Sequence, residues 1–259
     1  MSILPYTIAV AGKGGVGKTT FCGLLVQYLT QKARGPILVV DADANSNLGE
    51  VLGVPVETTL GEIREEIERS AMDSNTPLPA GMTKQDYMNF RFGDALAEED
   101  KFDLLVMGRT QGRGCYCFVN GLLQTQLERI SGQYDYVVVD NEAGMEHISR
   151  GILPKVDMLL LVSDCSRRGV QAAARIRDLA EELNLNPGKT GLIVNRAPGG
   201  VLNEGTASEI ERLKLPLVGV LPHDETIYEY DCEGKSLVSL PSDALVRQAF
   251  AETLRTLEI

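Results

Sequence analysis

The sequence predicts one α/β domain built on a doubly wound, mostly parallel sheet with helices on both faces. Three observations predict this fold class. Short runs rich in Val, Ile and Leu alternate with amphipathic helical patterns, which is typical of parallel strands joined by helical crossovers. A glycine-rich stretch follows the first apolar run directly and leads into a helical pattern. With 259 residues, 44% of them apolar, the chain is long enough to bury a large core as a single domain.

The expected strands are seven short runs that are almost continuously apolar, as strands buried on both faces should be. In chain order they are Tyr6 to Ala11, Ile37 to Val40, Phe102 to Met107, Tyr136 to Val139, Met158 to Val162, Gly191 to Val194 and Leu217 to Val220.

Helical spacing of apolar residues predicts helices between these strands, with most of their charged residues facing solvent. Two clear examples are the sets Leu60, Ile63 and Ile67, and Val170, Ala173, Ala174, Ile176 and Leu183. The stretch 72–95 breaks the alternation, because it holds two prolines, polar residues and scattered aromatics. We expect it to be an insertion or a mobile element within the single domain 1–259.

Composition excludes several classes of function. The chain has 25 Lys and Arg against 36 Asp and Glu, which gives a formal net charge of −11. This charge disfavours sequence-independent binding of nucleic acid. No stretch reaches the ~18 to 20 apolar residues that span a bilayer, and the start MSILPYTIAV lacks the features of an export signal. Five cysteines in such a chain favour reduced thiols over a disulfide framework. We therefore expect a cytoplasmic protein that binds neither nucleic acid nor membrane.

The strongest motif is GKGGVGKT, residues 12–19, which matches the phosphate-binding loop G-x-x-x-x-G-K-[ST] between a strand and a helix. Its glycines let backbone N–H groups turn inward around phosphate oxygens, and the helix N-terminus adds its positive end. Lys18 supplies a charge at the β and γ phosphates, and the Thr19 hydroxyl can bind Mg²⁺. The expected nucleotide-binding residues here are Gly14, Gly15, Val16, Gly17, Lys18, Thr19 and Thr20.

Acidic residues follow two later strands. Asp41 and Asp43 end the second expected strand, and Asp140 ends a later one. Open α/β sheets bind ligands at the carboxyl ends of their strands, so we expect these carboxylates to face the phosphates. Alternatively, Asp41 or Asp43 is an ordinary helix N-cap.

A second motif is GRGCYC, in which Cys115 and Cys117 are separated by one residue and preceded by flexible glycines. Two such thiols can chelate Zn²⁺ or Ni²⁺, and a closed tetrahedral site needs four ligands, so the same pair from a second chain would complete it. Alternatively, the two cysteines are buried hydrophobic residues or a redox couple. We expect structural roles for the other three cysteines, Cys22, Cys165 and Cys232.

The loop GKGGVGKT, with Lys13 inside it, resembles the deviant phosphate-binding loop of the partitioning (MinD and ParA), nitrogenase iron protein and arsenite-pump ATPases. The resemblance implies that Lys13 reaches a nucleotide across a dimer interface, so that two chains enclose two ATP molecules. It also implies that Asp140 holds Mg²⁺ through water, that Asp41 supports the same ion and that Asp43 orients the attacking water. The roles of Asp41 and Asp43 could be exchanged.

The same family indicates the base. GTP-binding relatives place an aspartate three residues after an Asn-Lys pair, whereas this chain reads VNRAP, with Pro198 in place of the aspartate. Adenine is therefore expected, with Asn195 and Arg196 near it and Pro222 as a lid. Alternatively, Asn195 only caps a strand.

With that loop before it, the string CYC resembles the nickel-inserting ATPases that mature carbon monoxide dehydrogenase and acetyl-CoA synthase, the CooC and AcsF type. The resemblance covers nearly the whole chain and rests on GKGGVGKT, the DAD segment, GCYC, DNEAG and VNR. It implies a homodimer whose Cys115 and Cys117 pairs hold one Ni²⁺ or Zn²⁺ ion. It also implies ATP turnover tied to delivery of nickel to an apo-enzyme client.

Two other functions stay open at this point. An ATP-driven iron–sulfur electron carrier resembling the nitrogenase iron protein would have its second cysteine in the segment that here reads GMEHIS. A positioning or partitioning ATPase would have a basic amphipathic end, whereas LVRQAFAETLRTLEI is balanced in charge.

Overall fold

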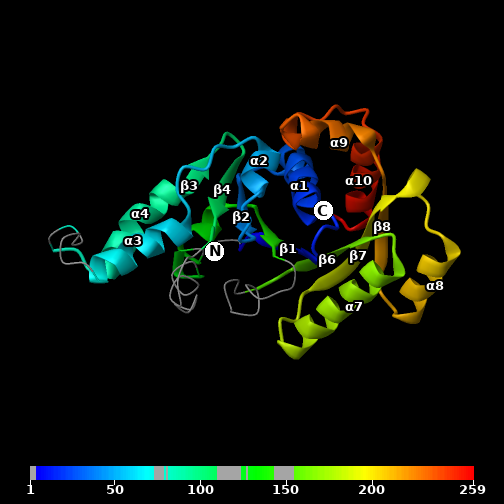
Figure 1. The fold of residues 1–259 in the computed structure, drawn as a ribbon, viewed down its shortest axis with the longest axis horizontal. Coiled ribbons are helices and arrows are strands. Elements are labelled where there is room, and N and C mark those ends of the chain that lie inside the picture. The colour runs from blue at the N-terminus through cyan, green and yellow to red at the C-terminus, as the bar shows by residue number, and fades with distance from the viewer. Residues whose placement is uncertain (1–3, 73–78, 80, 110–123, 127, 143–154) are drawn as a thin grey trace.

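The computed structural model describes residues 4–72, 79, 81–109, 124–126, 128–142 and 155–259 (Figure 1). Their strands form one eight-stranded sheet in the order β3-β4-β2-β5-β1-β6-β7-β8. The pairings are parallel except β3 with β4, which is antiparallel. The strands are β1 (Tyr6–Gly12), β2 (Ile37–Ala42), β3 (Leu96–Glu98), β4 (Phe102–Val106), β5 (Tyr136–Asn141), β6 (Met158–Asp164), β7 (Lys189–Ala197) and β8 (Leu217–Pro222).

The predicted fold class is confirmed, and all seven expected strands are present. The eighth strand, β3, was not predicted. It has three residues and lies at the sheet edge, where burial is incomplete and imposes no apolar run.

Helices cover both faces of this sheet (Figure 1). In β1, Ala9 and Ala11 face one buried cluster while Ile8 and Val10 face the other, as the two-residue period of a strand requires. One cluster includes α3 (Leu60–Met72), α4 (Lys84–Phe92), α7 (Arg167–Glu182) and α8 (Glu204–Arg212). The other includes α1 (Lys18–Lys32), α2 (Leu48–Leu52), the 3-10 turn η4 (Leu237–Ser239) and α10 (Leu245–Thr256). The remaining elements are α9 (Glu225–Cys232), η1 (Gly93–Ala95), η2 (Ser131–Gln133) and η3 (Pro198–Gly200).

The stretch 72–95 contains regular structure. Helix α4 begins with a capping box in which Thr83 Oγ1 accepts from the Asp86 backbone N–H and the Asp86 carboxylate accepts from Thr83. Its Met88 and Phe92 are buried against the sheet side that also packs α3. Whether the stretch is an insertion stays a prediction.

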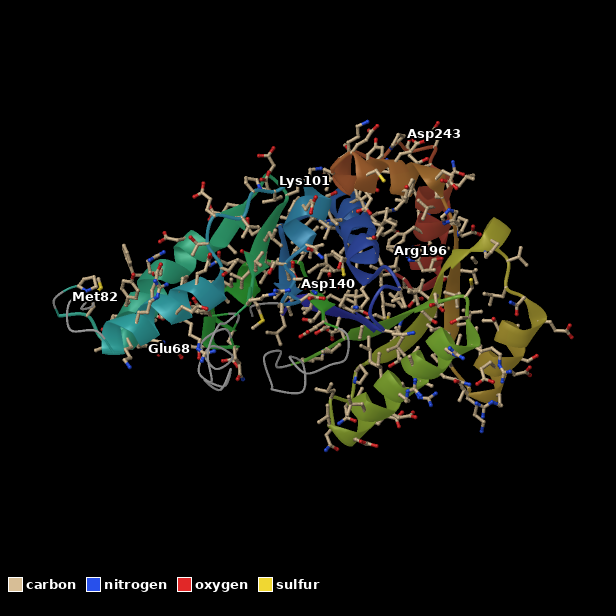
Figure 2. The ribbon with its side chains drawn as sticks, in the orientation of Figure 1. Glu68, Met82, Lys101, Asp140, Arg196 and Asp243 are labelled. Atoms are coloured by element: carbon tan, nitrogen blue, oxygen red, sulfur yellow. The ribbon has the colours of Figure 1, made fainter. Side chains whose placement is uncertain are left out.

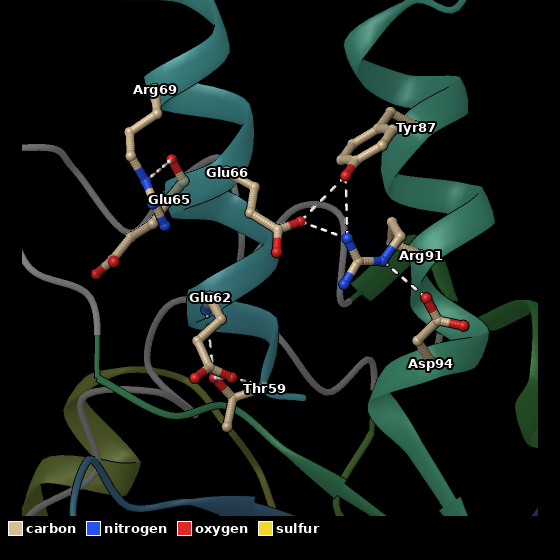
Figure 3. Close-up of polar contacts among 8 residues, drawn as sticks. All are labelled: Thr59, Glu62, Glu65, Glu66, Arg69, Tyr87, Arg91 and Asp94. Atoms are coloured by element: carbon tan, nitrogen blue, oxygen red, sulfur yellow. Dashed lines mark hydrogen bonds and ion pairs between the residues drawn. The ribbon is translucent and has the colours of Figure 1, made fainter. Parts of the chain in front are cut away.

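Polar contacts join α4 to α3 (Figure 3). Arg91 pairs with Glu66, and the Tyr87 hydroxyl donates to the same Glu66 carboxylate at 3.1 Å. Arg91 also donates to Asp94 at 2.7 Å. A departure from the expected solvent-facing charges is Arg64 of α3, which is 3% exposed and pairs with Glu68.

Among the helices in the described ranges, none combines the length and the apolar character that a bilayer crossing requires.

Candidate nucleotide-binding site

The phosphate-binding loop lies between the end of β1 and the start of α1. Gly15 and Gly17 have φ angles of +80° and +90°, in the left-handed region where residues with a Cβ are strained. A Cβ at Gly12 would lie 2.3 Å from the Val162 carbonyl oxygen, and one at Gly17 would lie 2.6 Å from Asn195 Nδ2. Glycine is therefore required at position 12 by close packing, at position 15 by backbone conformation and at position 17 by both.

The start of α1 is open to an anion. Gly17 is its N-cap and offers no side-chain acceptor, and the first turn has no acidic residue. The first N–H groups of the helix thus lack a side-chain cap, and they carry the positive end of the helix dipole. Lys18 is 7% exposed and its Nζ donates to the Lys13 carbonyl oxygen at 3.4 Å. The Lys13 side chain is exposed on the loop.

Two buried carboxylates lie side by side at the carboxyl edge of the sheet. Asp41 of β2 and Asp140 of β5 are register partners and are 0% and 1% exposed. Asp140 lies near the centre of the molecule (Figure 2). Burial raises the pKa of Asp41 to about 7, with the charge of Asp140 adding to the effect. Burial also raises the pKa of Asp140 to about 6, opposed by the Thr19 hydroxyl and the Lys18 charge.

The hydrogen bonds of the three acidic residues differ. Asp41 accepts from the backbone N–H of Asp43 and of Leu48, both at 3.0 Å, so its two oxygens hold the 41–48 loop. Neither oxygen of Asp140 has a hydrogen-bond partner within the described residues. Asp43 is half-buried, and its Oδ1 accepts from both the backbone and the side chain of Asn45.

This donor set fits a magnesium ion. Burying a carboxylate without a hydrogen-bond partner is costly unless a cation compensates its charge, and within the described part of the chain Asp140 is such a carboxylate. The Thr19 hydroxyl lies close enough to lower the pKa of Asp140. Hard oxygen ligands of this kind, together with phosphate oxygens, are those that Mg²⁺ takes. Thr19 and Asp140 would therefore hold the ion, which when bound neutralises charge on the phosphates.

A cavity of about 520 Å³ extends from the phosphate loop. It is lined by Thr19 and Thr20 at one end and by Asn195, Arg196 and Pro222 farther along, so the structure brings the predicted base-binding residues together. Asn195 Nδ2 donates to the Val16 carbonyl at 2.9 Å, and Arg196 Nη1 donates to the Gly15 carbonyl at 3.3 Å. Both residues therefore also fix the back of the loop.

Part of the cavity wall was not predicted from the sequence. Helix α2 contributes Glu50 and Val51, and α9 contributes Tyr228 and Tyr230. The sequence holds no motif for these residues, because segments far apart in the chain bring them to the same cavity. The one local signal is the pair of tyrosines, Tyr228 and Tyr230, in the segment IYEYD of α9.

The predicted metal ligands Cys115 and Cys117 lie outside the described residues. Of the other cysteines, Cys22 is fully buried on α1, where burial raises the pKa of its thiol well above the usual range. Cys165 is half-buried and its thiol contacts the Arg196 carbonyl at 3.8 Å, and Cys232 is exposed. Among the described residues, no three or more His, Cys, Asp or Glu side chains gather in a way that could hold a metal ion.

The fold and this edge define a P-loop nucleotide-binding domain. The model of the family described as the CobQ/CobB/MinD/ParA nucleotide binding domain matches residues 7–238, and the chain belongs to this family.

Three individual comparisons agree with this assignment. An uncharacterized ATP-binding protein of Methanocaldococcus jannaschii is 44% identical, over 91% of this chain and 92% of its own. The carbon monoxide dehydrogenase accessory protein CooC of Rhodospirillum rubrum is 30% identical, over 90% of this chain and 89% of its own. The septum site-determining protein MinD of Pyrococcus horikoshii, solved with Mg-ADP, shares the fold with a TM-score of 0.70 at 20% identity, covering 98% of this chain and 96% of that one.

Proposed function

We propose that this protein is an ATPase that acts as a nickel metallochaperone. Two chains close around ATP, bind one divalent metal ion through their paired Cys115 and Cys117, and deliver it to an apo nickel enzyme such as carbon monoxide dehydrogenase or acetyl-CoA synthase. The observation that carries the proposal is the similarity to the CooC accessory protein along almost the full length of both chains, in a sequence that also holds GCYC.

The nucleotide half of the proposal rests on the phosphate edge. The open start of α1 and the buried Lys18 bind the phosphates of ATP, and the cavity lined by Asn195, Arg196 and Pro222 takes adenine. Lys13, exposed on the loop, reaches the nucleotide of the partner chain. Thr19 and Asp140 hold Mg²⁺.

The hydrogen bonds favour one division of roles between the two remaining aspartates. Asp41 is occupied by two backbone N–H groups and shapes the loop, whereas Asp43 is partly open to solvent. We therefore assign to Asp43 the positioning of the attacking water and to Asp41 the support of the loop beside the ion. In-line attack needs little more from the protein than such positioning and charge stabilisation.

The metal-binding part of the proposal rests on the C-x-C pair and on thermodynamic coupling between ATP binding and metal binding. If ATP and metal both favour the closed dimer, each raises the affinity for the other by the same factor. Thiolate ligands suit both Ni²⁺ and Zn²⁺. Release of phosphate would then reopen the dimer and weaken the metal site during transfer to the client.

Equilibrium binding tests the metal half directly. Ni²⁺ or Zn²⁺ affinity is measured on the wild type and on Cys115→Ser/Cys117→Ser, with and without ATP, while light scattering reports the oligomeric state. We expect one metal per two chains, tighter binding with ATP, and loss of that site in the double variant. Unchanged affinity in the double variant would contradict the proposal.

Client activation tests the complete cycle. Purified apo carbon monoxide dehydrogenase is incubated with nickel, ATP and either the wild type or Lys18→Ala. The proposal requires faster gain of activity with the wild type than with nickel alone, and no such gain with Lys18→Ala. Cys232→Ser is the matched cysteine control, because that thiol is exposed on α9.

A further inference from the structure

A chain of hydrogen bonds joins the end of β4 to Asp43. Arg109 Nη2 donates to Asn45 Oδ1 at 2.7 Å, and its Nε donates to the Ala44 carbonyl at 3.2 Å. Asn45 in turn donates to Asp43 Oδ1 twice, from its backbone N–H at 2.9 Å and from its side-chain Nδ2 at 3.0 Å. The loop after β2 and the residue that follows β4 are therefore linked through Asn45, whose two donors meet on one oxygen of the Asp43 carboxylate.

The chemistry of arginine fixes which atom of Asn45 faces each of its two partners. A guanidinium only donates, so the Asn45 oxygen must face Arg109, and the Asn45 amide nitrogen must then face Asp43. Asp43 Oδ1 is fixed by both donors, whereas Oδ2 makes no hydrogen bond within the described residues. One oxygen of Asp43 is thus held, and the other is left to accept from water.

The backbone that carries Arg109 is itself held in place. The Met107 N–H donates to the Asp41 carbonyl at 2.9 Å, and the Gly61 N–H donates to the Met107 carbonyl at 2.8 Å. Gly108 has a φ of +69° and packs directly on Thr59. A Cβ at Gly61 would lie 2.5 Å from the Arg109 carbonyl oxygen. The guanidinium is exposed, but its anchor is fixed by β2 and by the start of α3.

We propose that Arg109 is a positioning residue for ATP hydrolysis, which acts through Asn45 to fix the orientation of the Asp43 carboxylate. The proposal rests on the proposed ATPase activity and on the proposed role of Asp43. It makes the rate of hydrolysis depend on the position of the chain at the end of β4. It assigns no contact between Arg109 and the nucleotide.

Steady-state kinetics on four variants tests the proposal: Arg109→Ala, Arg109→Lys, Asn45→Ala and the double variant Arg109→Ala/Asn45→Ala. Misplacing a catalytic group by about 1 Å costs on the order of 10- to 100-fold in rate, so we expect kcat to fall by about that factor in Arg109→Ala. KM for ATP and the affinity for ADP stay at the wild-type level, because the loop 12–19 and the base cavity are untouched.

The double variant separates a relay from two independent contributions. If Arg109 acts through Asn45, the double variant has the same kcat as the more impaired single variant. Arg109→Lys keeps the charge but not the planar fork that contacts both acceptors, so its kcat lies between those of the wild type and Arg109→Ala. It also carries the test if Arg109→Ala does not fold. Arg255→Ala, an exposed arginine at the end of α10, is the control and keeps the wild-type kcat.

The outcomes distinguish the proposals. Wild-type kcat in Arg109→Ala, together with a large loss in Asp43→Asn, overturns the role of Arg109 and leaves the proposed ATPase standing. A rise in KM with kcat unchanged, or multiplicative losses in the double variant, also overturns it. A wild-type chain that does not hydrolyse ATP at all overturns the proposed function and the relay together.

Discussion

The phosphate edge and the α3–α4 pair are stabilised in different ways. At the phosphate edge, Gly12 and Gly17 pack closely on other segments of the chain, and the carboxylates of Asp41 and Asp140 are 0% and 1% exposed. Between α3 and α4, ion pairs such as Arg91 with Glu66 join side chains that are 20% and 34% exposed. Buried, unpaired charge stores free energy that a ligand can release, whereas exposed ion pairs contribute little and are screened by salt. The difference predicts where substitutions remove activity and where they only reduce stability.

The largest effect is expected for Lys18→Ala. Lys18 is the buried cation among the described residues of the phosphate loop, and its loss removes charge stabilisation of the transferring phosphoryl group. We expect kcat for ATP to fall by at least about 10²- to 10³-fold. A phosphate-release assay measures this rate. Activity within a few-fold of the wild type would contradict the assignment of this edge.

Gly17→Ala comes next, with Gly15→Ala as its matched control. Both positions have positive φ, but a Cβ at Gly17 meets Asn195 Nδ2 at 2.6 Å, whereas one at Gly15 meets nothing within 4 Å. Backbone strain costs about 1–3 kcal/mol at either site. Because of the added contact, Gly17→Ala loses more free energy of unfolding than Gly15→Ala, as measured by urea unfolding. Equal losses of unfolding free energy in the two variants would show that the contact with Asn195 adds nothing to the destabilisation.

A pH effect is expected from the buried carboxylates. The pKa values of Asp41 and Asp140 are raised from 3.8 to about 7 and about 6, so the folded nucleotide-free chain holds protons that the unfolded chain has already released. This contribution to stability is fully present below about pH 4 and is lost as the pH rises through the folded-state values of 6 to 7.

Asp140→Asn isolates one carboxylate of this pair. Without the buried charge, the variant loses less stability than the wild type between pH 4.5 and 7.5, by on the order of 2 kcal/mol. It also gains less stability from Mg-ADP, because the ligand no longer compensates a buried carboxylate. Urea unfolding at both pH values, with and without Mg-ADP, checks both statements. Parallel pH profiles for variant and wild type would refute the first.

The smallest effect is expected at α3–α4. Arg91→Ala removes the contacts with Glu66, Tyr87 and Asp94, and the free energy of unfolding falls by about 1 kcal/mol, less at high salt. ATP hydrolysis stays at the wild-type rate, because α3 and α4 lie at one end of the molecule, away from the start of α1 (Figure 1). A clear fall in kcat in Arg91→Ala would contradict the expectation that substitutions between α3 and α4 reduce only stability.

The elements that could be predicted from the sequence are those whose physical constraints act on residues close together in the chain. Buried parallel strands need continuous apolar runs, so all seven long strands could be located, whereas the three-residue β3 could not. The loop 12–19 was predicted because positive φ and close phosphate approach demand glycine at fixed spacing. The helix within 72–95 was not predicted, because its short apolar face is set by packing on α3 rather than by a long period.

By itself the sequence determined the fold class, the phosphate loop and the presence of acidic residues at strand ends, since each depends on residue types at short spacing. Only the tertiary structure decided that Asp41 and Asp140 are register partners, that Asp41 is occupied by backbone N–H groups, and that Arg109 reaches Asp43 through Asn45. The reason is that burial and hydrogen-bond partners come from residues far apart in the chain, and no local pattern records which oxygen of a carboxylate is held and which is left open.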